Sequence, residues 1–435
     1  MMMIDPRWTQ GERPRIILAA PNVSRRMGGE AIKALSIFEG YKALGFDVTQ
    51  ITHARVRDEL SAIHRDDVVY IEDGPVQIGL YRLKLDWLLG VVSSWLLGRA
   101  VQREVRLKKP WIVHFTSPIS PSGINFPIRG APVVIGPLNG NLLHPPALLF
   151  RESRSKRIGA TLTRPLQMVS RIFFRGKLDA RLFVSGGERT VRVLEMGGCK
   201  RSRIAMTLDS GVDRHLRDQP RIDHCGDNWN FVFLGRLVRY KGCDLVIRAM
   251  KHVPQATLDI IGDGEEGDAL RTLAEVEGVG SRVRFHGYVT DRDVLFERLK
   301  ACRGFLFPTL AEANGIAIQE AMMVGLPIVC VNWGGPQQLL DSDIAILIEP
   351  ESEETIVTAL ASAMSRLATD PALAESLSLG ARAVAERRGF DWPNVLQAWI
   401  ALYDEWLEEC GSPHRFVNAN QEATEDILPM AAQTG

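Results

Sequence analysis

The 435-residue chain has only six cysteines, which are scattered, with no Cys-x-x-Cys pair and no cluster of histidine and cysteine. This excludes a zinc site of common spacing and a disulfide framework, and it fits a reducing compartment. The most apolar stretch, residues 87–98, is too short for the roughly 20 residues of a membrane span, and residues 1–15 lack the apolar core of a signal peptide. We therefore expect no transmembrane helix, no secretion and a cytoplasmic location.

The chain also lacks net charge, with 52 basic and 52 acidic residues, but its two halves differ. Residues 1–210 hold 32 Lys and Arg against 18 Asp and Glu, a net +14, and residues 211–435 hold 20 against 34, a net −14. A basic half suits an anionic partner such as a phosphorylated substrate, a membrane surface or nucleic acid. The acidic half argues against general nucleic-acid binding, so we expect no nucleic-acid partner.

Short apolar strands alternate with helical segments in two series, within a composition that is ordinary for a globular protein. This rhythm is typical of doubly wound parallel sheets, so we predict the α/β class with two Rossmann-like βαβ domains. The first series of strands is expected at 15–20, 46–52, 68–71, 111–115, 132–135 and 182–184. The second is expected at 231–234, 257–261, 283–286, 304–307, 327–331 and 344–348.

Four segments follow from this pattern. An N-terminal domain is predicted over 1–210 and a second domain over 211–388, with a polar stretch at 221–230 between the two series. A C-terminal helix at 389–410 is expected to cross back to the N-terminal domain. The polar residues 411–435 show no periodicity and are predicted to be a disordered tail.

The strongest local pattern places two carboxylates, Glu312 and Glu320, around a strand-to-helix turn. Glu312 precedes a helix that begins near Gly315, and Glu320 lies inside that helix, so both can face the carboxyl end of the sheet. The free N–H groups at such a helix start suit a phosphate. Acidic residues near helix starts are also common caps, so the spacing alone leaves a structural role open.

A second pattern lies in the loop 235–242, where Gly235 and Gly242 frame two cations after a strand. Arg236 can grip phosphate oxygens through its planar fork, and Lys241 adds a compact charge. Together they can stabilise a diphosphate leaving group without a metal. A solvated surface loop is the alternative.

A Gly-x-Gly-x-x-Gly sequence at 262–267 matches the dinucleotide-binding fingerprint, but we do not expect a nicotinamide or flavin site there. Asp263, Glu265 and Glu266 would repel a pyrophosphate, and the motif follows a middle strand of its series.

In combination these pieces resemble the family 4 retaining glycosyltransferases of the GT-B fold, also called glycosyl transferases group 1. The resemblance covers residues 15–405, is weaker in the first half, and implies two domains that face each other across a cleft. Six motifs appear in the order of that family: Gly-Arg-(Leu)-x-x-x-Lys-Gly at 235–242, Ile-x-Gly-x-Gly at 260–264, Val-x-Phe-x-Gly at 283–287, Glu-x-x-Gly-x-x-x-x-Glu-Ala at 312–321, Gly-x-Pro-(Ile/Val)-Val at 325–329 and Gly-Gly at 334–335.

The resemblance implies a retaining, metal-independent transfer of a sugar, of hexosyltransferase type, from a nucleotide diphosphate donor to a hydroxyl acceptor. Arg236 and Lys241 would then hold the diphosphate, Glu312 would lie at the sugar and Glu320 at the ribose. The acceptor, a sugar or a lipid-linked molecule, would bind the N-terminal domain. Further donor-binding residues implied by the family are Gly28, Gly29, Gly235, Gly287, Tyr288, Asn314, Gly315 and Ile316.

Two motifs depart from the family pattern and put the identity of the donor sugar in doubt. The usual Glu-Gly-Phe-Gly reads Glu-Ala-Asn-Gly at 312–315, and a carboxylate usual after Gly-Gly is replaced by Gln338. His114, at the end of a strand, is a further catalytic candidate that would hold the sugar or deprotonate the acceptor, although a lone histidine is more often structural.

A basic amphipathic segment at 151–181 carries nine Lys and Arg against two acidic residues, interleaved with apolar side chains. Such a segment can lie on an anionic inner membrane leaflet, where lipid-linked acceptors are found, or it can pack on the sheet with a solvated basic face.

The sequence therefore predicts a glycosyltransferase of bacterial-type polysaccharide or glycoconjugate synthesis, with neither a cofactor nor a metal. Another GT-B enzyme such as a nucleotide-sugar epimerase, and a non-catalytic sugar-binding relic, stay open as alternatives.

Overall fold

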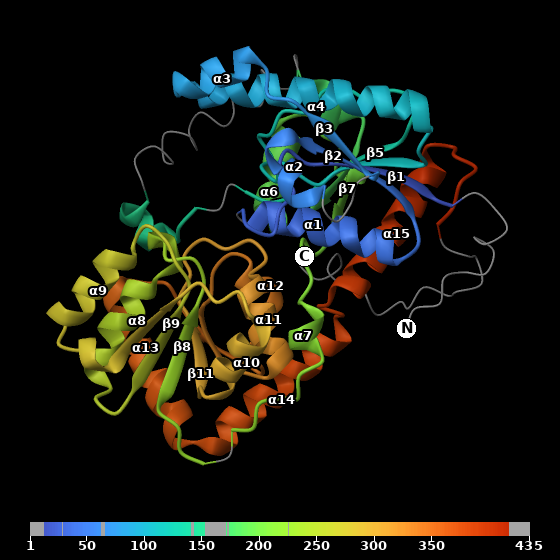
Figure 1. The fold of residues 1–435 in the computed structure, drawn as a ribbon. Coiled ribbons are helices and arrows are strands. Elements are labelled where there is room, and N and C mark those ends of the chain that lie inside the picture. Colours follow the sequence, from blue (N-terminus) through green and yellow to red (C-terminus); the bar gives the residue numbers. More distant parts are fainter. Residues whose placement is uncertain are drawn as a thin grey trace. The chain divides into compact units, whose positions relative to one another are not determined.

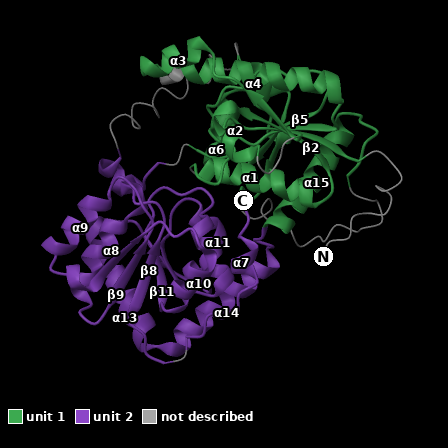
Figure 2. Ribbon diagram, viewed as in Figure 1, with its two compact units in different colours: residues 1–141, 160–209, 392–435 green, residues 142–159, 210–391 purple. Residues whose placement is uncertain are grey.

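The computed structural model describes residues 13–27, 29–61, 66–140, 143–152, 171, 174–224 and 226–416. The chain divides into two compact units (Figure 2): unit 1 holds residues 1–141, 160–209 and 392–435, and unit 2 holds residues 142–159 and 210–391. Each unit is built on one parallel sheet covered by helices, so the predicted α/β class with two Rossmann-like domains is confirmed.

Unit 1 contains a seven-stranded sheet in the order β3-β2-β1-β4-β5-β6-β7 (Figure 1). Each strand predicted in the first series is present, and β7 is an addition that the sequence pattern did not indicate. The strands are β1 (Arg15–Ala19), β2 (Asp47–His53), β3 (Val68–Ile71), β4 (Ile112–Phe115), β5 (Val133–Leu138), β6 (Arg181–Val184) and β7 (Ile204–Met206). The helices are α1 (Gly29–Ala43), α2 (Arg57–Leu60), α3 (Pro75–Arg82), α4 (Asp86–Lys108), α6 (Gly187–Met196) and α15 (Trp392–Glu409).

Alternate residues of β1 enter two different cores, because side chains of a strand point to opposite faces of the sheet. Ile16 and Leu18 join a core that α1 and α15 complete, while Ile17 and Ala19 join a core on the other face that includes residues of α4 and α6. Both faces of the sheet are therefore covered, which is why its strands read as continuous apolar runs.

The helix α15 supplies large aromatic side chains to the first of these cores. Trp399 and Tyr403 are fully buried, and the Tyr403 hydroxyl hydrogen-bonds the Tyr41 hydroxyl of α1 at 2.8 Å. The Trp399 indole N–H donates to Thr207 Oγ1 at 2.9 Å. Although it follows unit 2 in the sequence, α15 thus belongs to the interior of unit 1.

His114 lies in that same interior, which does not fit the catalytic role suggested for it. Its side chain is completely buried, Nδ1 pairs with the Tyr403 hydroxyl at 2.6 Å and Nε2 with the Gly136 carbonyl at 2.8 Å. Burial lowers the pKa of His114 to about 3. Since both nitrogens are engaged and no face is open to a substrate, His114 is a structural residue and is not carried into the proposed mechanism.

Unit 2 contains a six-stranded sheet in the order β10-β9-β8-β11-β12-β13. All six strands predicted in the second series are present, as β8 (Asn230–Leu234), β9 (Thr257–Ile261), β10 (Val283–Gly287), β11 (Gly304–Phe307), β12 (Ile328–Val331) and β13 (Ala345–Ile348). The helices are α7 (Arg214–Arg217), α8 (Cys243–Ala249), α9 (Gly267–Val276), α10 (Arg292–Lys300), α11 (Ile316–Val324), α12 (Pro336–Leu339), α13 (Glu353–Thr369) and α14 (Pro371–Arg387).

Local sequence signals fix several of these helix starts. The Ser352 and Asp370 side chains accept backbone N–H groups at the starts of α13 and α14, and Pro371 occupies the first position of α14, where its missing N–H costs nothing. Asp291 caps α10 in the same way.

The short stretch 143–152 packs with unit 2, whereas the sequence assigned it to the domain 1–210. Arg151 explains the difference, because its buried guanidinium pairs with both carboxylate oxygens of Asp244 at 2.8 Å and with Glu353 at 2.7 Å. Trp333 also donates its indole N–H to the Leu143 carbonyl at 2.9 Å.

Two other expectations concern parts of the chain that are only partly described. Residues 153–170, the centre of the basic segment, and 417–435, most of the tail, lie outside the described residues. Within the described ranges, every helix is too short or too polar to cross a bilayer.

The buried state of His114 predicts how stability depends on pH. Its folded pKa lies below the ordinary value of 6.5, so the unfolded chain binds the proton more tightly and stability falls as pH drops from about 6.5 toward 3. His114→Gln should remove this contribution. Below pH 6 the unfolding free energy of the variant should therefore change less steeply with pH than that of the wild type, by up to about 1.4 kcal/mol per pH unit. Urea titrations of both proteins at several pH values would measure the difference. Parallel pH profiles would show that His114 titrates normally.

Candidate functional site

The candidate site in unit 2 lies where the strand order of the sheet changes direction. β8 has β9 on one side and β11 on the other, so the loops that leave β8 and β11 emerge next to each other at the carboxyl edge. In open parallel sheets this switch point is where ligands bind. The two loops, 235–242 and 308–315, contain six of the thirteen site residues predicted from the sequence, namely Gly235, Arg236, Lys241, Glu312, Asn314 and Gly315.

An ion pair between Lys241 and Glu312 joins these two loops. Each side chain is only 15 % exposed, and the Lys241 ammonium also lies 4.8 Å from the centre of the Phe307 ring. The backbone reinforces the contact, because Leu310 N–H donates to the Tyr240 carbonyl at 2.8 Å. The structure thus brings together two predicted site residues that are 71 positions apart in the sequence.

Arg236, the other predicted cation, has a different environment. Its side chain is exposed, and its guanidinium makes no hydrogen bond or ion pair with any residue that the structure describes. The loop around it is ordered, since Leu237 N–H donates to the Asp263 carbonyl at 2.9 Å and Glu266 N–H to the Leu237 carbonyl at 3.0 Å. A fixed backbone that carries an uncommitted guanidinium is suited to binding an anion.

Glycines make this loop geometry possible through close backbone contacts. A Cβ atom on Gly262 would lie 2.0 Å from the Gly235 carbonyl oxygen, and one on Gly264 would lie 2.2 Å from that of Leu237. A Cβ on Gly242 would lie 2.3 Å from the Pro308 carbonyl oxygen. The Gly-x-Gly sequence at 262–264 therefore packs one strand end against the next, which accounts for the fingerprint without a dinucleotide.

A glycine in the loop after β12, Gly335, supports the backbone around Glu312. Gly335 N–H donates to the Glu312 carbonyl at 2.8 Å, and a Cβ on Gly335 would lie 1.9 Å from the Ala313 carbonyl oxygen. Gly315, with φ of 65°, precedes the first residue of α11, Ile316, which is 39 % exposed. Asn314 is buried, and its amide lies 3.3 Å from the Ser210 hydroxyl. Glu312 is thus held by backbone contacts on either side.

Glu320 lies one turn inside α11 and is almost fully buried. Burial raises its pKa, and Arg292 at the start of α10 opposes that rise with a hydrogen bond of 3.1 Å to Oε1. The nearby Asp213 carboxylate raises the pKa of Glu320 further. A buried carboxylate with one cationic partner has further oxygen lone pairs that can accept hydroxyl hydrogens.

Arg292 was missed in the sequence analysis. A usable signal was present, because Arg292 follows the capping residue Asp291 at the start of a helix that leaves the carboxyl end of β10. A charged side chain at that position lies at the ligand-binding edge of the sheet.

The remaining predicted donor contacts fall into two groups. Gly287 ends β10 with φ of 69°, and Tyr288 follows it with 63 % of its surface exposed and its N–H bonded to the Asp263 carboxylate at 3.0 Å. Gly29 starts α1 of unit 1, with open space where its Cβ would be. Gly28 lies outside the described residues. The donor site is therefore described from unit 2 alone.

Comparisons with known proteins match the part of the chain that contains this site. Residues 217–382 match the model of the family described as glycosyl transferases group 1. The lipopolysaccharide core biosynthesis glycosyltransferase LpsD of Rhizobium meliloti is 31% identical over 178 residues, which are 41% of this chain and 50% of that protein. D-inositol 3-phosphate glycosyltransferase 1 of Catenulispora acidiphila is 27% identical over 251 residues, 52% of this chain and 58% of that protein. The chain thus spans only about half the length of such curated relatives.

Solved structures extend the likeness over both units at the level of the fold. A glycosyltransferase from Rickettsia africae has a TM-score of 0.64 at 14% identity, covering 92% of this chain and 100% of that one. The Anabaena protein HepE in complex with UDP and glucose has a TM-score of 0.61 at 18% identity, covering 90% and 99%. The GT-B architecture expected from the sequence is confirmed.

The close approach at Gly262 predicts a large effect of one methyl group. Gly262→Ala should lower the unfolding free energy of unit 2 by about 2 kcal/mol or more beyond any backbone strain, because the Gly235 carbonyl must move. Gly278→Ala is the matched control, since Gly278 also has positive φ but has open space around its Cβ position. Urea unfolding would compare the two, and equal losses would contradict the packing role of Gly262.

Proposed function

We propose that the protein is a retaining glycosyltransferase, since its residues 217–382 match the family described as glycosyl transferases group 1. It would move a sugar from a nucleotide diphosphate donor to a hydroxyl acceptor. The observation that carries this proposal is the arrangement at the switch point of unit 2: Lys241 is paired with Glu312, Glu320 is paired with Arg292, and Arg236 has no side-chain partner among the described residues.

The chemistry of sugar transfer explains the need for these charges. Negative charge develops on the departing diphosphate, and Arg236 and Lys241 would stabilise it in place of a metal ion. Positive charge develops at the anomeric carbon, where the Glu312 carboxylate would be favourable. Because Lys241 is already paired with Glu312, the same lysine would link the phosphate end of the site to the sugar end.

The nucleoside of the donor would bind at the end of the site opposite the sugar. Glu320 would accept hydrogen bonds from the ribose hydroxyls, with Arg292 holding its carboxylate in place. Tyr288, exposed after β10, would lie at the base, and the N–H groups at Asn314, Gly315 and Ile316 would contact the donor. UDP is the first nucleotide to test, since several similar structures hold it.

The acceptor and the pathway are less closely specified. We propose that unit 1 binds the acceptor, a sugar or a lipid-linked molecule, in polysaccharide or glycoconjugate synthesis on the cytoplasmic side of a membrane. The names of the two Rhizobium meliloti relatives, LpsD and LpsE, which refer to lipopolysaccharide core synthesis, support this assignment. The membrane contact predicted for residues 151–181 stays a prediction.

The donor site predicts a defined response to nucleotides. UDP or a UDP-sugar at about 100 times its Kd should stabilise the protein by about 2.7 kcal/mol, seen as a raised melting temperature. Arg236→Ala should weaken binding roughly tenfold or more, because a charge-assisted contact is worth about 1.5–3 kcal/mol. Arg239→Ala, an exposed arginine on the same loop, is the control and should leave the affinity unchanged. Equal affinities for the two variants would contradict the role of Arg236.

The reaction type predicts two further outcomes. Release of nucleoside diphosphate from the donor should be insensitive to EDTA, because the arginine and lysine replace the metal.

The sugar transferred, or released by slow hydrolysis, should keep its anomeric configuration when followed by NMR. Inversion would overturn the retaining mechanism. Nucleotide binding without transfer would favour the sugar-binding relic, and a donor sugar altered at carbon 2 would favour the epimerase.

A further inference from the structure

The helix α3 of unit 1 has its polarity reversed. Val76, Ile78 and Tyr81 are 63 %, 44 % and 72 % exposed, and among the residues of this helix only Gln77 is buried. A helix on the surface of a globular protein normally buries its apolar side chains and exposes its polar ones. Three apolar side chains on different sides of α3 are therefore exposed, while the one buried side chain of the helix is polar.

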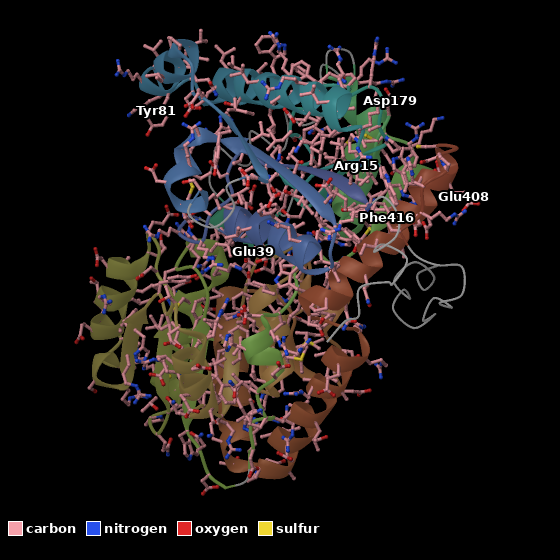
Figure 3. The ribbon with its side chains drawn as sticks, turned by 45° about the vertical axis from the view of Figure 1, so that its right-hand side comes forward. Arg15, Glu39, Tyr81, Asp179, Glu408 and Phe416 are labelled. Carbon is pink, nitrogen blue, oxygen red and sulfur yellow. The ribbon has the colours of Figure 1, made fainter. Side chains whose placement is uncertain are left out.

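Gln77 holds α3 in this orientation. Its side-chain amide donates to the Ser93 hydroxyl of α4 at 3.0 Å, and its carbonyl oxygen accepts the Gly74 N–H at 3.0 Å. Figure 1 shows α3 next to the start of α4 on the outer side of unit 1, and Figure 3 shows Tyr81 on α3. The buried polar contact joins α3 to α4, and we call these two helices the hairpin. This contact leaves the apolar side chains of α3 exposed.

The apolar surface continues from α3 onto α4. Leu88 and Trp95, 41 % and 43 % exposed, are seven residues apart and share one face of α4, while Leu97 and Val101 on another face are buried in the core. Seven of the sixteen exposed large hydrophobic side chains in the described part of the chain fall within residues 76–95. We name as the hairpin surface the six residues Val76, Ile78, Tyr81, Leu83, Leu88 and Trp95.

Positive charge accompanies this apolar surface. Residues 75–99, which contain the hairpin surface, carry the basic residues Arg82, Lys84 and Arg99 against one acidic residue, Asp86, a net +2. Arg82 and Lys84 are exposed between the two helices, and the Arg99 guanidinium lies 4.8 Å from the centre of the Trp95 ring. Concentrated exposed apolar groups mark an interaction site, and the basic residues favour an anionic partner.

An anionic lipid bilayer fits this combination best. Aliphatic side chains insert into the boundary between headgroups and acyl chains, aromatic rings such as Tyr81 and Trp95 favour the interface, and cations pair with phosphates. The chain's own segment 153–170 does not suit the hairpin surface, because it carries four basic residues and no acidic one. A second copy of the hairpin would bring the same positive charge.

We propose that the hairpin surface docks unit 1 on an anionic bilayer, with Arg82, Lys84 and Arg99 on the lipid phosphates. This places the membrane contact on α3 and α4, outside the segment 151–181, for which the sequence left both a membrane contact and packing on the sheet open. The proposal does not depend on the donor site of unit 2, so nucleotide binding and membrane binding are separate measurements.

The test is co-sedimentation of the full chain with vesicles of phosphatidylcholine and phosphatidylglycerol, compared with phosphatidylcholine alone. The wild type should bind the anionic vesicles more tightly, and high salt should weaken that binding. The triple variant Val76→Ser/Tyr81→Ser/Leu83→Ser should bind about tenfold or more weakly. Arg82→Gln/Lys84→Gln should bind roughly 25-fold more weakly, since each basic residue near the surface contributes about fivefold.

Matched controls separate docking from folding. Val276→Ser/Leu379→Ser removes two exposed apolar side chains of unit 2, 76 % and 51 % exposed, and should leave vesicle binding unchanged. All variants should keep the wild-type melting temperature and nucleotide affinity, because the replaced side chains are exposed and lie outside the donor site.

Several results would overturn the proposal. One is a triple variant that binds vesicles as the wild type does, and another is wild-type protein that binds neither vesicle or both equally. Loss of binding in Arg154→Gln/Lys156→Gln/Arg157→Gln, with the hairpin variants unaffected, would assign the contact to the basic segment. Self-association in sedimentation velocity that Tyr81→Ser abolishes, without vesicle binding, would make the hairpin surface a contact between copies.

Discussion

The geometry of the candidate site depends on the contact between the loops that follow β8 and β11. The Lys241–Glu312 ion pair joins them at the switch point of the sheet, and glycine contacts bring their backbones close enough for it to form. Because neither partner is fully exposed, the pair keeps a charge of each sign at the carboxyl edge without leaving an unpaired buried ion. Arg236 lies on the same loop as Lys241 and makes no side-chain hydrogen bond or ion pair with the residues that the structure describes, so the site combines a fixed ion pair with a guanidinium that can bind an anion.

Much of the fold was predictable from the sequence because parallel sheets buried on both faces give short, continuous apolar strands. The six strands of unit 2 and the loops that carry Arg236, Lys241 and Glu312 could be placed from this rhythm and from the glycines at the ends of β8, β9 and β10. β7 was missed because it is only three residues long. The positions of Gly262 and Gly264 suggested a dinucleotide motif, and only the backbone contacts with the neighbouring loop show what these glycines do.

The failures have a common physical cause, which is packing between residues distant in the sequence. His114 lies near the carboxyl end of β4, as a catalytic residue of such a fold would, but α15 covers it with Tyr403, 289 residues later. The stretch 143–152 follows unit 1 in the sequence, yet Arg151 pairs with Asp244 and Glu353 of unit 2. Arg292 shows the same limit, since its contact with Glu320 becomes visible only when two helices are placed together. Neither composition nor residue spacing indicates such pairings.

The interior position of α15 also determines the order in which the two units can complete their folding during synthesis. A chain leaves the ribosome from its N-terminus, and domains commonly fold as they emerge. Unit 2 has its last strand and helices by residue 391, while the core of unit 1 still lacks Trp399 and Tyr403 at that point. The unit that begins first in the sequence is therefore the one completed last, and its unfinished apolar surface must stay free of aggregation while the other unit is synthesised.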